Sequence, residues 1–349
     1  MYTPHKITEL VVTMQVSPKL RILIFLGMLS DKCHVLKAKR TVYFLGPGDG
    51  SSSTSEIMVI TPGVDPTIDG KVAKPFPYPS QTSAVYGLVG GVINTSITLC
   101  GGADHGGNVF SECFFLSSNT QNWNKFPGLL NPRGFATATA VLTDCLLVIG
   151  GRSDGMKTLG TSEVNINGRW KMGPSLPYPV EQHCSVSINS THVFVIGGLG
   201  NVEPIKRFSS AFIMDARTGL VTMAGNMVNG ERSGHGCSLL PGGQVMVVGG
   251  DSYPGDVGKT VEVYHIALNK WVQGPRLPED INGSPGLVTD AGGRVFLIGG
   301  YSEEGISDAI YQGDGKNWWK IKTKMISKRG IFPVFEINSN WTNVEVIEK

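Results

Sequence analysis

Glycine pairs that follow apolar runs are the first residues in this sequence that could do chemistry. They end ITLCGG (97–102), LLVIGG (146–151), VFVIGG (193–198), VMVVGG (245–250) and VFLIGG (295–300). A glycine turn after a strand can cradle a phosphate only when a helix begins behind it, because the free N–H groups and dipole of that helix hold the anion. Here turn residues and another apolar run follow each pair. We therefore reject nucleotide binding and interpret the glycines as sharp backbone bends.

Two histidines occupy the same position relative to their glycine pairs. His183 and His235 each stand 14 residues before the first glycine, and two imidazoles at equivalent places could hold a metal ion. The alternative is a pair of neutral histidines that are hydrogen-bonded inside the fold. No Gly-x-Ser-x-Gly or His-Glu-x-x-His motif accompanies them, so we expect neither a metal nor another cofactor, and no enzyme.

The glycine pairs recur about every 50 residues, so the segments around them form an internal repeat. The first glycines of six units lie near residues 46, 101, 150, 197, 249 and 299. Trp123, Trp170, Trp271 and Trp318 follow their glycines by about 20 residues, whereas units one and four lack this tryptophan. Each unit contains four short extended segments separated by Gly, Pro, Asn and Asp turns.

A four-stranded sheet has two faces to bury, and stacking such units radially buries both. We therefore predict an all-β fold, a six-bladed β-propeller of four-stranded antiparallel blades. Glycine pairs that end the second strand, a third strand reading VEVY and the spaced tryptophans resemble the Kelch repeat over roughly residues 41–335. The resemblance implies a Kelch-type propeller, and we interpret the tryptophans as packing between blades rather than as a ligand platform.

The expected domain limits are residues 30–340 for the propeller, 1–29 for an N-terminal extension or signal segment, and 341–349 for a C-terminal tail. The apolar run at 22–29 follows two basic residues and resembles a secretory signal, with a plain N-terminal strand as the alternative. Kelch-type rings often close with a strand from one terminus. By that resemblance RGIFPVFEI (329–337) would complete blade one, and SDKCHVLKA (30–38) competes for the place. With about 40 residues before the repeats, we expect no second adaptor domain.

The cysteines and the N-glycosylation sequons indicate in which cellular compartment the protein works. Cys100 and Cys113 flank one glycine pair on adjacent strands, and Cys184 and Cys237 share a position on neighbouring first strands. Both pairs are disulfide candidates, with buried free thiols as the alternative. Glycosylation sequons begin at Asn94, Asn189, Asn282 and Asn340. These features favour a secreted glycoprotein over a cytoplasmic protein.

The Kelch resemblance also implies a binding face. In that family the loops between second and third strands, and between fourth and first strands, share one face that grips partner proteins. The residues expected there are Arg133, Arg232 and Arg329 before first strands, and Arg152, Tyr253 and Tyr301 after glycine pairs. Arginine and tyrosine suit such a surface because they offer planar donors and amphipathic area. Alternatively, the arginines tie blades together through carbonyls or carboxylates.

We therefore predict a non-enzymatic, monomeric module that binds a partner protein. The net charge of +2 gives no reason to expect nucleic acid, and no apolar run reaches the length of about 20 residues that a membrane span needs. The alternatives are a galactose-oxidase-like or metal-dependent propeller enzyme and a glycan-binding propeller. Galactose oxidase has a Kelch-like propeller with copper held by His and Tyr, and no convincing set of such ligands is present here.

Overall fold

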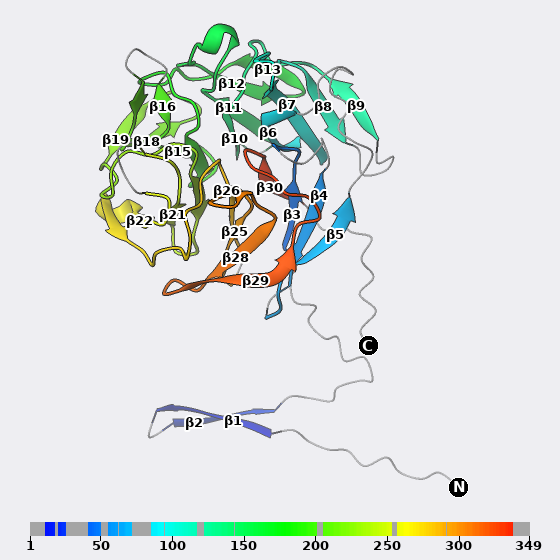
Figure 1. Cartoon of the computed structure of the whole chain (residues 1–349). Coiled ribbons are helices and arrows are strands. Elements are labelled where there is room, and N and C mark those ends of the chain that lie inside the picture. The colour runs from blue at the N-terminus through cyan, green and yellow to red at the C-terminus, as the bar shows by residue number, and fades with distance from the viewer. Residues whose placement is uncertain are drawn as a thin grey trace. The chain divides into compact units, whose positions relative to one another are not determined.

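The structure is a computed structural model that divides into two compact units, residues 1–39 and 40–349. It describes residues 11–17, 20–25, 41–49, 55–61, 63–71, 85–93, 95–116, 122–142, 144–200, 205–252, 257–290 and 292–337. In the first unit, β1 (Val11–Ser17) and β2 (Leu20–Phe25) form an antiparallel hairpin. The second unit is a ring of six four-stranded antiparallel sheets (Figure 1). The predicted six-bladed, all-β propeller is confirmed.

The blades follow one another in chain order, each from the channel outwards. Blade one is β30 (Val334–Ile337), β3 (Thr41–Leu45), β4 (Glu56–Ile60) and β5 (Thr67–Lys71); blade two is β6 (Val85–Ile93), β7 (Ser96–Asp104), β8 (Cys113–Leu116) and β9 (Trp123–Phe126); blade three is β10 (Thr137–Val141), β11 (Cys145–Ile149), β12 (Ser162–Ile166) and β13 (Arg169–Met172). Blade four is β14 (Cys184–Ser187), β15 (His192–Ile196), β18 (Ala211–Asp215) and β19 (Val221–Ala224); blade five is β20 (Gly236–Leu239), β21 (Gln244–Val248), β22 (Val261–His265) and β23 (Lys270–Gln273); blade six is β24 (Gly286–Thr289), β25 (Val295–Ile298), β28 (Ala309–Gly313) and β29 (Trp318–Lys324).

Short elements decorate this ring. The loops after two glycine pairs contain the hairpins β16 (Leu199–Gly200) with β17 (Lys206–Arg207), and β26 (Tyr301–Ser302) with β27 (Gly305–Ile306). Two 3-10 turns, η1 (Asp154–Met156) and η2 (Ile266–Leu268), are the helical segments among the described residues. No helix in this described part is long and apolar enough to cross a membrane.

The ring closes with a strand from the C-terminus. Strand β30 pairs antiparallel with β3, Phe335 opposite Phe44, so the last strand of the chain lies innermost in blade one beside its first propeller strand (Figure 1). Of the two segments that the sequence left in competition for this place, 329–337 supplies the strand. The competing segment 30–38 lies outside the described residues, as do residues 30 and 340 themselves, so those domain limits stay predictions. The signal interpretation of 22–29 also stays a prediction.

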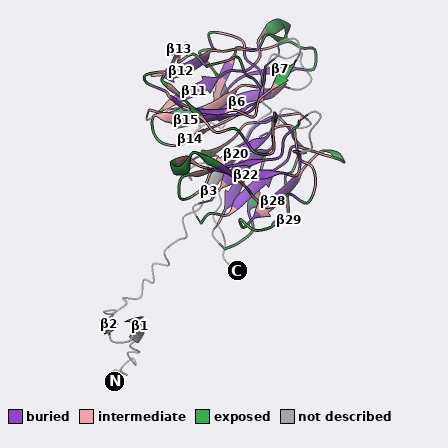
Figure 2. Ribbon diagram, turned by 90° about the vertical axis from the view of Figure 1, so that its left-hand side faces the viewer, coloured by how far each residue is buried: buried purple, intermediate pink, exposed green. Residues whose placement is uncertain are grey.

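Six apolar clusters hold the ring together, one between each pair of neighbouring blades. Buried residues fill the middle of the blades, while exposed ones lie mainly in the loops at their ends (Figure 2). The indole N–H groups of Trp170 and Trp271 donate across these joints to the carbonyls of Pro127 (2.9 Å) and Gly225 (2.6 Å). The predicted role of these two tryptophans in packing between blades is confirmed.

The glycine pairs bend the chain as predicted. Gly150 and Gly151 both have positive φ, 59° and 92°, a conformation that glycine adopts without steric cost. A Cβ atom on Gly150 would lie 2.3 Å from the carbonyl oxygen of Val180 in the connection to the next blade. The first glycine is therefore required twice, by its backbone conformation and by the close approach of the neighbouring chain.

Candidate functional site

A closed belt of backbone hydrogen bonds surrounds the channel where the chain enters each inner strand. Its six residues have left-handed φ between 48° and 65°: Gly87, Phe135, Gln182, Gly234, Ser284 and Ile331. Five of them donate to the carbonyl of the preceding belt residue, and Ile331 donates to the carbonyl of Gly283, with lengths of 2.8–3.0 Å. Belt residues line a channel cavity of ≈ 160 Å³. The belt therefore fixes the channel mouth on the face that carries the loops after the glycine pairs.

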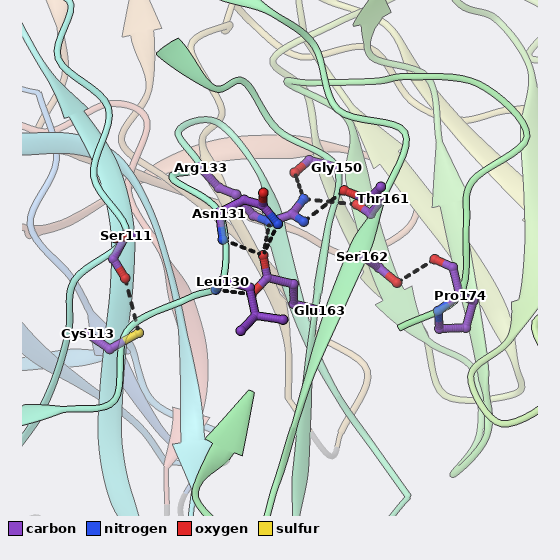
Figure 3. Close-up of polar contacts among 10 residues, drawn as sticks. All are labelled: Ser111, Cys113, Leu130, Asn131, Arg133, Gly150, Thr161, Ser162, Glu163 and Pro174. Atoms are coloured by element: carbon purple, nitrogen blue, oxygen red, sulfur yellow. Dashed lines mark hydrogen bonds and ion pairs between the residues drawn. The ribbon is translucent and has the colours of Figure 1, made fainter. Parts of the chain in front are cut away.

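The predicted partner-contacting Arg133 is instead buried beneath this face. Its Nε donates to Glu163 Oε1 at 2.9 Å, and its Nη1 donates to the carbonyls of Gly150 (2.8 Å) and Thr161 (2.9 Å), as Figure 3 shows. The exposed fraction of its side chain is 0%. Burial lowers the pKa of this guanidinium, and the nearby Glu163 carboxylate opposes that effect. Arg133 and Glu163 thus form a fully desolvated ion pair, and the guanidinium N–H groups of Arg133 donate to acceptors in blade three.

The same arrangement recurs at two further joints. Arg232 donates to Glu262 and to the carbonyl of Gly249 at 2.9 Å. Arg329 donates to Glu56 and to the carbonyl of Gly46 at 2.7 Å. The exposed fraction of both guanidinium-bearing side chains is 0%. Direct partner contact by all three arginines is therefore wrong, because a partner cannot reach them; they tie blades together, as the alternative stated.

Each buried carboxylate also fixes an exposed apolar residue. Leu130, Val228 and Ile326 donate their peptide N–H to Glu163 (2.6 Å), Glu262 (2.6 Å) and Glu56 (2.9 Å) respectively. Their exposed fractions are 53%, 56% and 53%. The side chains project from the connections that lead into blades three, five and one. Three apolar residues are thus held at fixed positions on the face that carries the channel mouth.

The two histidines lie inside the ring. His183 shares a hydrogen bond with Thr137 Oγ1 through Nε2 at 2.8 Å, and burial lowers its pKa to about 3. Burial, the charge of Arg232 and the neighbouring His183 place the pKa of His235 well below its usual range. Both imidazoles are therefore neutral at physiological pH. Within the part of the chain that the structure describes, no three His, Cys, Asp or Glu side chains gather in a way that could hold a metal ion.

The cysteines pair as the strand positions predicted. Cys100 and Cys113 join adjacent strands of blade two, and Cys184 and Cys237 join the inner strands of blades four and five. The second disulfide lines the channel cavity. Cys145 is a free, half-buried thiol. Disulfides of this kind persist in oxidising compartments.

Arg152 lies on one side of the channel mouth. The Arg152 guanidinium lies 4.3 Å from the centre of the Phe135 ring, and its Nε is 3.5 Å from Glu181 Oε2, an ion pair longer than a hydrogen bond. Burial raises the pKa of Glu181 to about 7, although Arg152 opposes that rise. Arg152, expected at this face, therefore lies at the mouth, engaged by an aromatic ring and a carboxylate.

An adjoining part of the mouth gathers loops of blades one, two and six. Tyr301 donates its hydroxyl to Asp49, and His105 Nε2 lies 3.5 Å from the other carboxylate oxygen. The Tyr86 ring is 4.9 Å from the His105 ring. Burial, followed by the hydrogen bond to Asp49, raises the pKa of the Tyr301 hydroxyl. Tyr301, also expected at this face, is half-buried. Its ring lies directly against Gly283, beside the belt residue Ser284, and leaves no room there for a Cβ atom.

The remaining candidates are only partly placed. Tyr253, Asn94 and Asn340 lie outside the described residues. Asn189 is exposed in a turn, where its Oδ1 accepts hydrogen bonds from the N–H groups of Thr191 (2.9 Å) and His192 (2.8 Å). Asn282 is half-buried at the mouth, where its N–H donates to the carbonyl of Tyr301 at 3.0 Å. Glycosylation at these sequons stays a prediction.

Sequence reasoning missed the acidic residues of this site. Glu163 and Glu262 each follow their arginine by 30 residues, and that repeated spacing is a signal that could have found two of the three ion pairs. Glu56 carries no such signal, because its arginine is 273 residues away. Asp49 and Glu181 occupy loops without a shared pattern, so their meeting with aromatic rings depends on the closed ring.

Six four-stranded blades closed around a channel define the molecule as a β-propeller. The solved structure of YjhT has the same fold, with a TM-score of 0.65 over 80% of this chain and 94% of that chain at 12% identity. Human Kelch-like protein 34 is 27% identical over 181 residues, which are 47% of this chain and 27% of that relative's length. No family model matches the sequence. The glycine and tryptophan repeat, the blade architecture and the similarity to part of this relative support a Kelch-type β-propeller.

Proposed function

We propose that this propeller is a monomeric, non-enzymatic interaction module that binds a partner protein on the face carrying the channel mouth. The observation that carries the proposal is the set of exposed apolar residues Leu130, Val228 and Ile326. Apolar side chains that protrude from a rigid surface supply binding energy when a partner desolvates them, and they lose little conformational freedom because their backbone is already fixed.

Rigidity distinguishes these three residues from ordinary exposed apolar residues. Each peptide N–H is held by a fully buried carboxylate that is itself paired with a buried arginine. Two more exposed apolar residues, Met156 (58%) and Ile205 (60%), stand in loops after glycine pairs on the same face. With the polar mouth between them, these residues give apolar contact points around a polar centre, a composition that suits protein recognition.

We also propose that the protein works outside the cell. Two disulfides support an oxidising compartment, and Asn189 offers an exposed sequon on the opposite face, where a glycan would leave the channel mouth free. Expression of the full chain in a secretory host, followed by mass spectrometry of the N-terminus, glycans and thiols, tests this location. An uncleaved chain with free thiols and no glycan would contradict it.

The binding face is tested with two matched triple variants. The face variant carries Leu130→Ser, Val228→Ser and Ile326→Ser. The control carries Val64→Ser, Leu220→Ser and Leu268→Ser, at exposed apolar positions of the loops between third and fourth strands on the opposite face. The wild type and both variants capture proteins from the host's extracellular fluid, and mass spectrometry quantifies them.

We expect proteins that the wild type and the control recover to be depleted at least tenfold by the face variant. Each exposed side chain contributes about 1 kcal/mol or more when a partner buries it. Equal recovery by the face variant, or equal losses from both triple variants, would contradict the proposed face. Unfolding midpoints of both variants check that each remains folded.

A further inference from the structure

The Asp49 corner of the mouth consists of Asp49, Tyr86, His105 and Tyr301, supplied by blades one, two and six. Its backbone is fixed, because Asp49 and Gly330 exchange two hydrogen bonds of 2.9 and 3.1 Å. Gly87, which follows Tyr86 in the chain, and Ile331, which follows Gly330, are belt residues that line the ≈ 160 Å³ channel cavity. A rigid carboxylate thus stands beside a cavity at the centre of the proposed binding face.

Asp49 differs from three other carboxylates of this face in its partner. Glu181 pairs with Arg152 at 3.5 Å, Asp251 with Arg207 at 2.6 Å, and Asp280 with Lys259 at 3.6 Å. Among the residues that the structure describes, the basic side chain beside Asp49 is His105, at 3.5 Å and 54% exposed. The carboxylate itself is 21% exposed. Asp49 is therefore an accessible acid at the mouth with no described lysine or arginine beside it.

The Arg152 site of the same molecule shows how a cation can bind between an aromatic ring and a carboxylate. Arg152 lies 4.3 Å above the Phe135 ring and 3.5 Å from Glu181, so a guanidinium there joins an aromatic face to a carboxylate. The Phe135 and Tyr86 rings are neighbours, 5.5 Å apart. The Asp49 corner repeats the aromatic ring and the carboxylate, while the Arg152 guanidinium acts on the Tyr86 hydroxyl from beside the Phe135 ring and does not pair with Asp49. Rings and a carboxylate together attract a cation more strongly than either alone.

We propose that the Asp49 corner receives a positively charged side chain, arginine or lysine, from a basic segment of the partner protein. This inference rests on the proposed function and specifies the chemistry of its partner. The incoming cation pairs with the Asp49 carboxylate, packs against Tyr86 and Tyr301, and displaces the exposed His105 ring. Glu304, exposed in the same loop as Tyr301, adds negative charge to this face, while Glu303 pairs with Lys259 at 3.9 Å.

The proposal is tested by calorimetry on the full chain with two probes, N-acetyl-arginine amide and its uncharged isostere N-acetyl-citrulline amide. We expect the arginine probe to bind at least tenfold more tightly than the citrulline probe. Asp49→Asn keeps an acceptor for the Tyr301 hydroxyl and should weaken the arginine probe about tenfold. His105→Gln removes the competing base and should strengthen it a fewfold. Asp154→Asn, an exposed acid on the same face, is the control and should change nothing.

Three results would overturn the inference: no binding of the arginine probe, equal binding of both probes, or unchanged binding by Asp49→Asn. The face variant at Leu130, Val228 and Ile326 should bind the arginine probe normally, because its substitutions leave the corner intact. If that variant loses partner proteins while the arginine probe fails to bind the wild type, the proposed function stands and the Asp49 corner is wrong.

Discussion

The joints into blades three and four share their backbone contacts but differ in side-chain chemistry. Arg133 and Val180 each donate their N–H to a loop carbonyl of the preceding blade and accept from the second glycine of its pair. Arg133 then crosses to Glu163 in blade three, whereas Val180 packs in an apolar cluster with Phe212 of blade four. The propeller backbone therefore accepts a buried ion pair or an apolar contact at the same position.

The charged joints also hold the surface connections in place, which the apolar joints do not. Glu163 accepts from the peptide N–H groups of Leu130 (2.6 Å) and Asn131 (3.0 Å), so the charge that ties two blades also fixes the connection above them. Blades one, three and five have such joints, while Val180 and Ile281 take the equivalent place before blades four and six. The buried charges therefore fix the positions of surface loops, whereas the apolar joints only hold neighbouring blades together.

The largest expected effect comes from breaking a charged joint on one side. Arg133→Met leaves Glu163 buried without its cation, and loss of one partner of a buried pair costs about 3–5 kcal/mol of unfolding free energy. Urea unfolding measures this loss. Arg217→Met, at an exposed arginine, is the control and should stay within about 0.5 kcal/mol of the wild type. A loss below about 1 kcal/mol for Arg133→Met would show that the two kinds of joint are energetically alike.

A second prediction uses pH to compare the histidines beside the two kinds of joint. The folded pKa of His183 is about 3 and that of His235 is well below 6.5, whereas both titrate near 6.5 when unfolded. The unfolded chain therefore binds more protons below pH 6.5, and stability falls as the pH falls from 6.5 towards 3. Between pH 7 and 5 His183 should account for about 2 kcal/mol of the loss, and His235 should add to it.

Urea unfolding at the two pH values checks this, with His183→Gln and His235→Gln each losing less stability than the wild type. The neighbouring Arg232 adds to the lowered pKa of His235, so His235→Gln should flatten the pH profile at least as much as His183→Gln. Variants as acid-sensitive as the wild type would contradict buried, neutral imidazoles.

A third variant converts a charged joint into an apolar one. Arg133→Val with Glu163→Phe reproduces the Val180 and Phe212 side chains of blade four. Replacing a buried ion pair with packed apolar groups is often nearly neutral, but the two loop N–H groups lose their acceptor, so we expect a net loss of about 1–2 kcal/mol. A double-mutant cycle in urea measures it. If the double variant is no more stable than Arg133→Met, the joints are not interchangeable.

The smallest effect is expected at an apolar joint. Ile281 is 1% exposed between blades five and six, and Ile281→Val removes one buried methylene at a cost of about 0.5–1.5 kcal/mol. The thermal midpoint should fall by only a few degrees, and probe binding at the mouth should not change. A loss as large as that of Arg133→Met would remove the distinction between the joints.

Much of the fold could be predicted because its determinants are local and repeated. Every glycine pair marks a bend between strands two and three, and every spaced tryptophan marks a fourth strand, so one unit identifies the next. Blade one is the exception: Gly46 begins a Gly-Pro-Gly turn, and its inner strand comes from residues 334–337. The sequence left this closure open between 329–337, which follows the last tryptophan as a first strand would, and 30–38.

The candidate site was less predictable, since exposure and pairing depend on residues from different blades. Arg133 and Arg152 both come from loops of one face, yet the first is buried against Glu163 and the second reaches the channel mouth. Nothing local to either arginine separates these outcomes. The sequence by itself determined six repeated units and their bends, because turn conformation and strand alternation depend on neighbouring residues. Only the tertiary structure decided which charges meet, because each pairing joins side chains from separate strands and loops, 30 residues apart for Arg133 and Glu163 and 273 for Arg329 and Glu56.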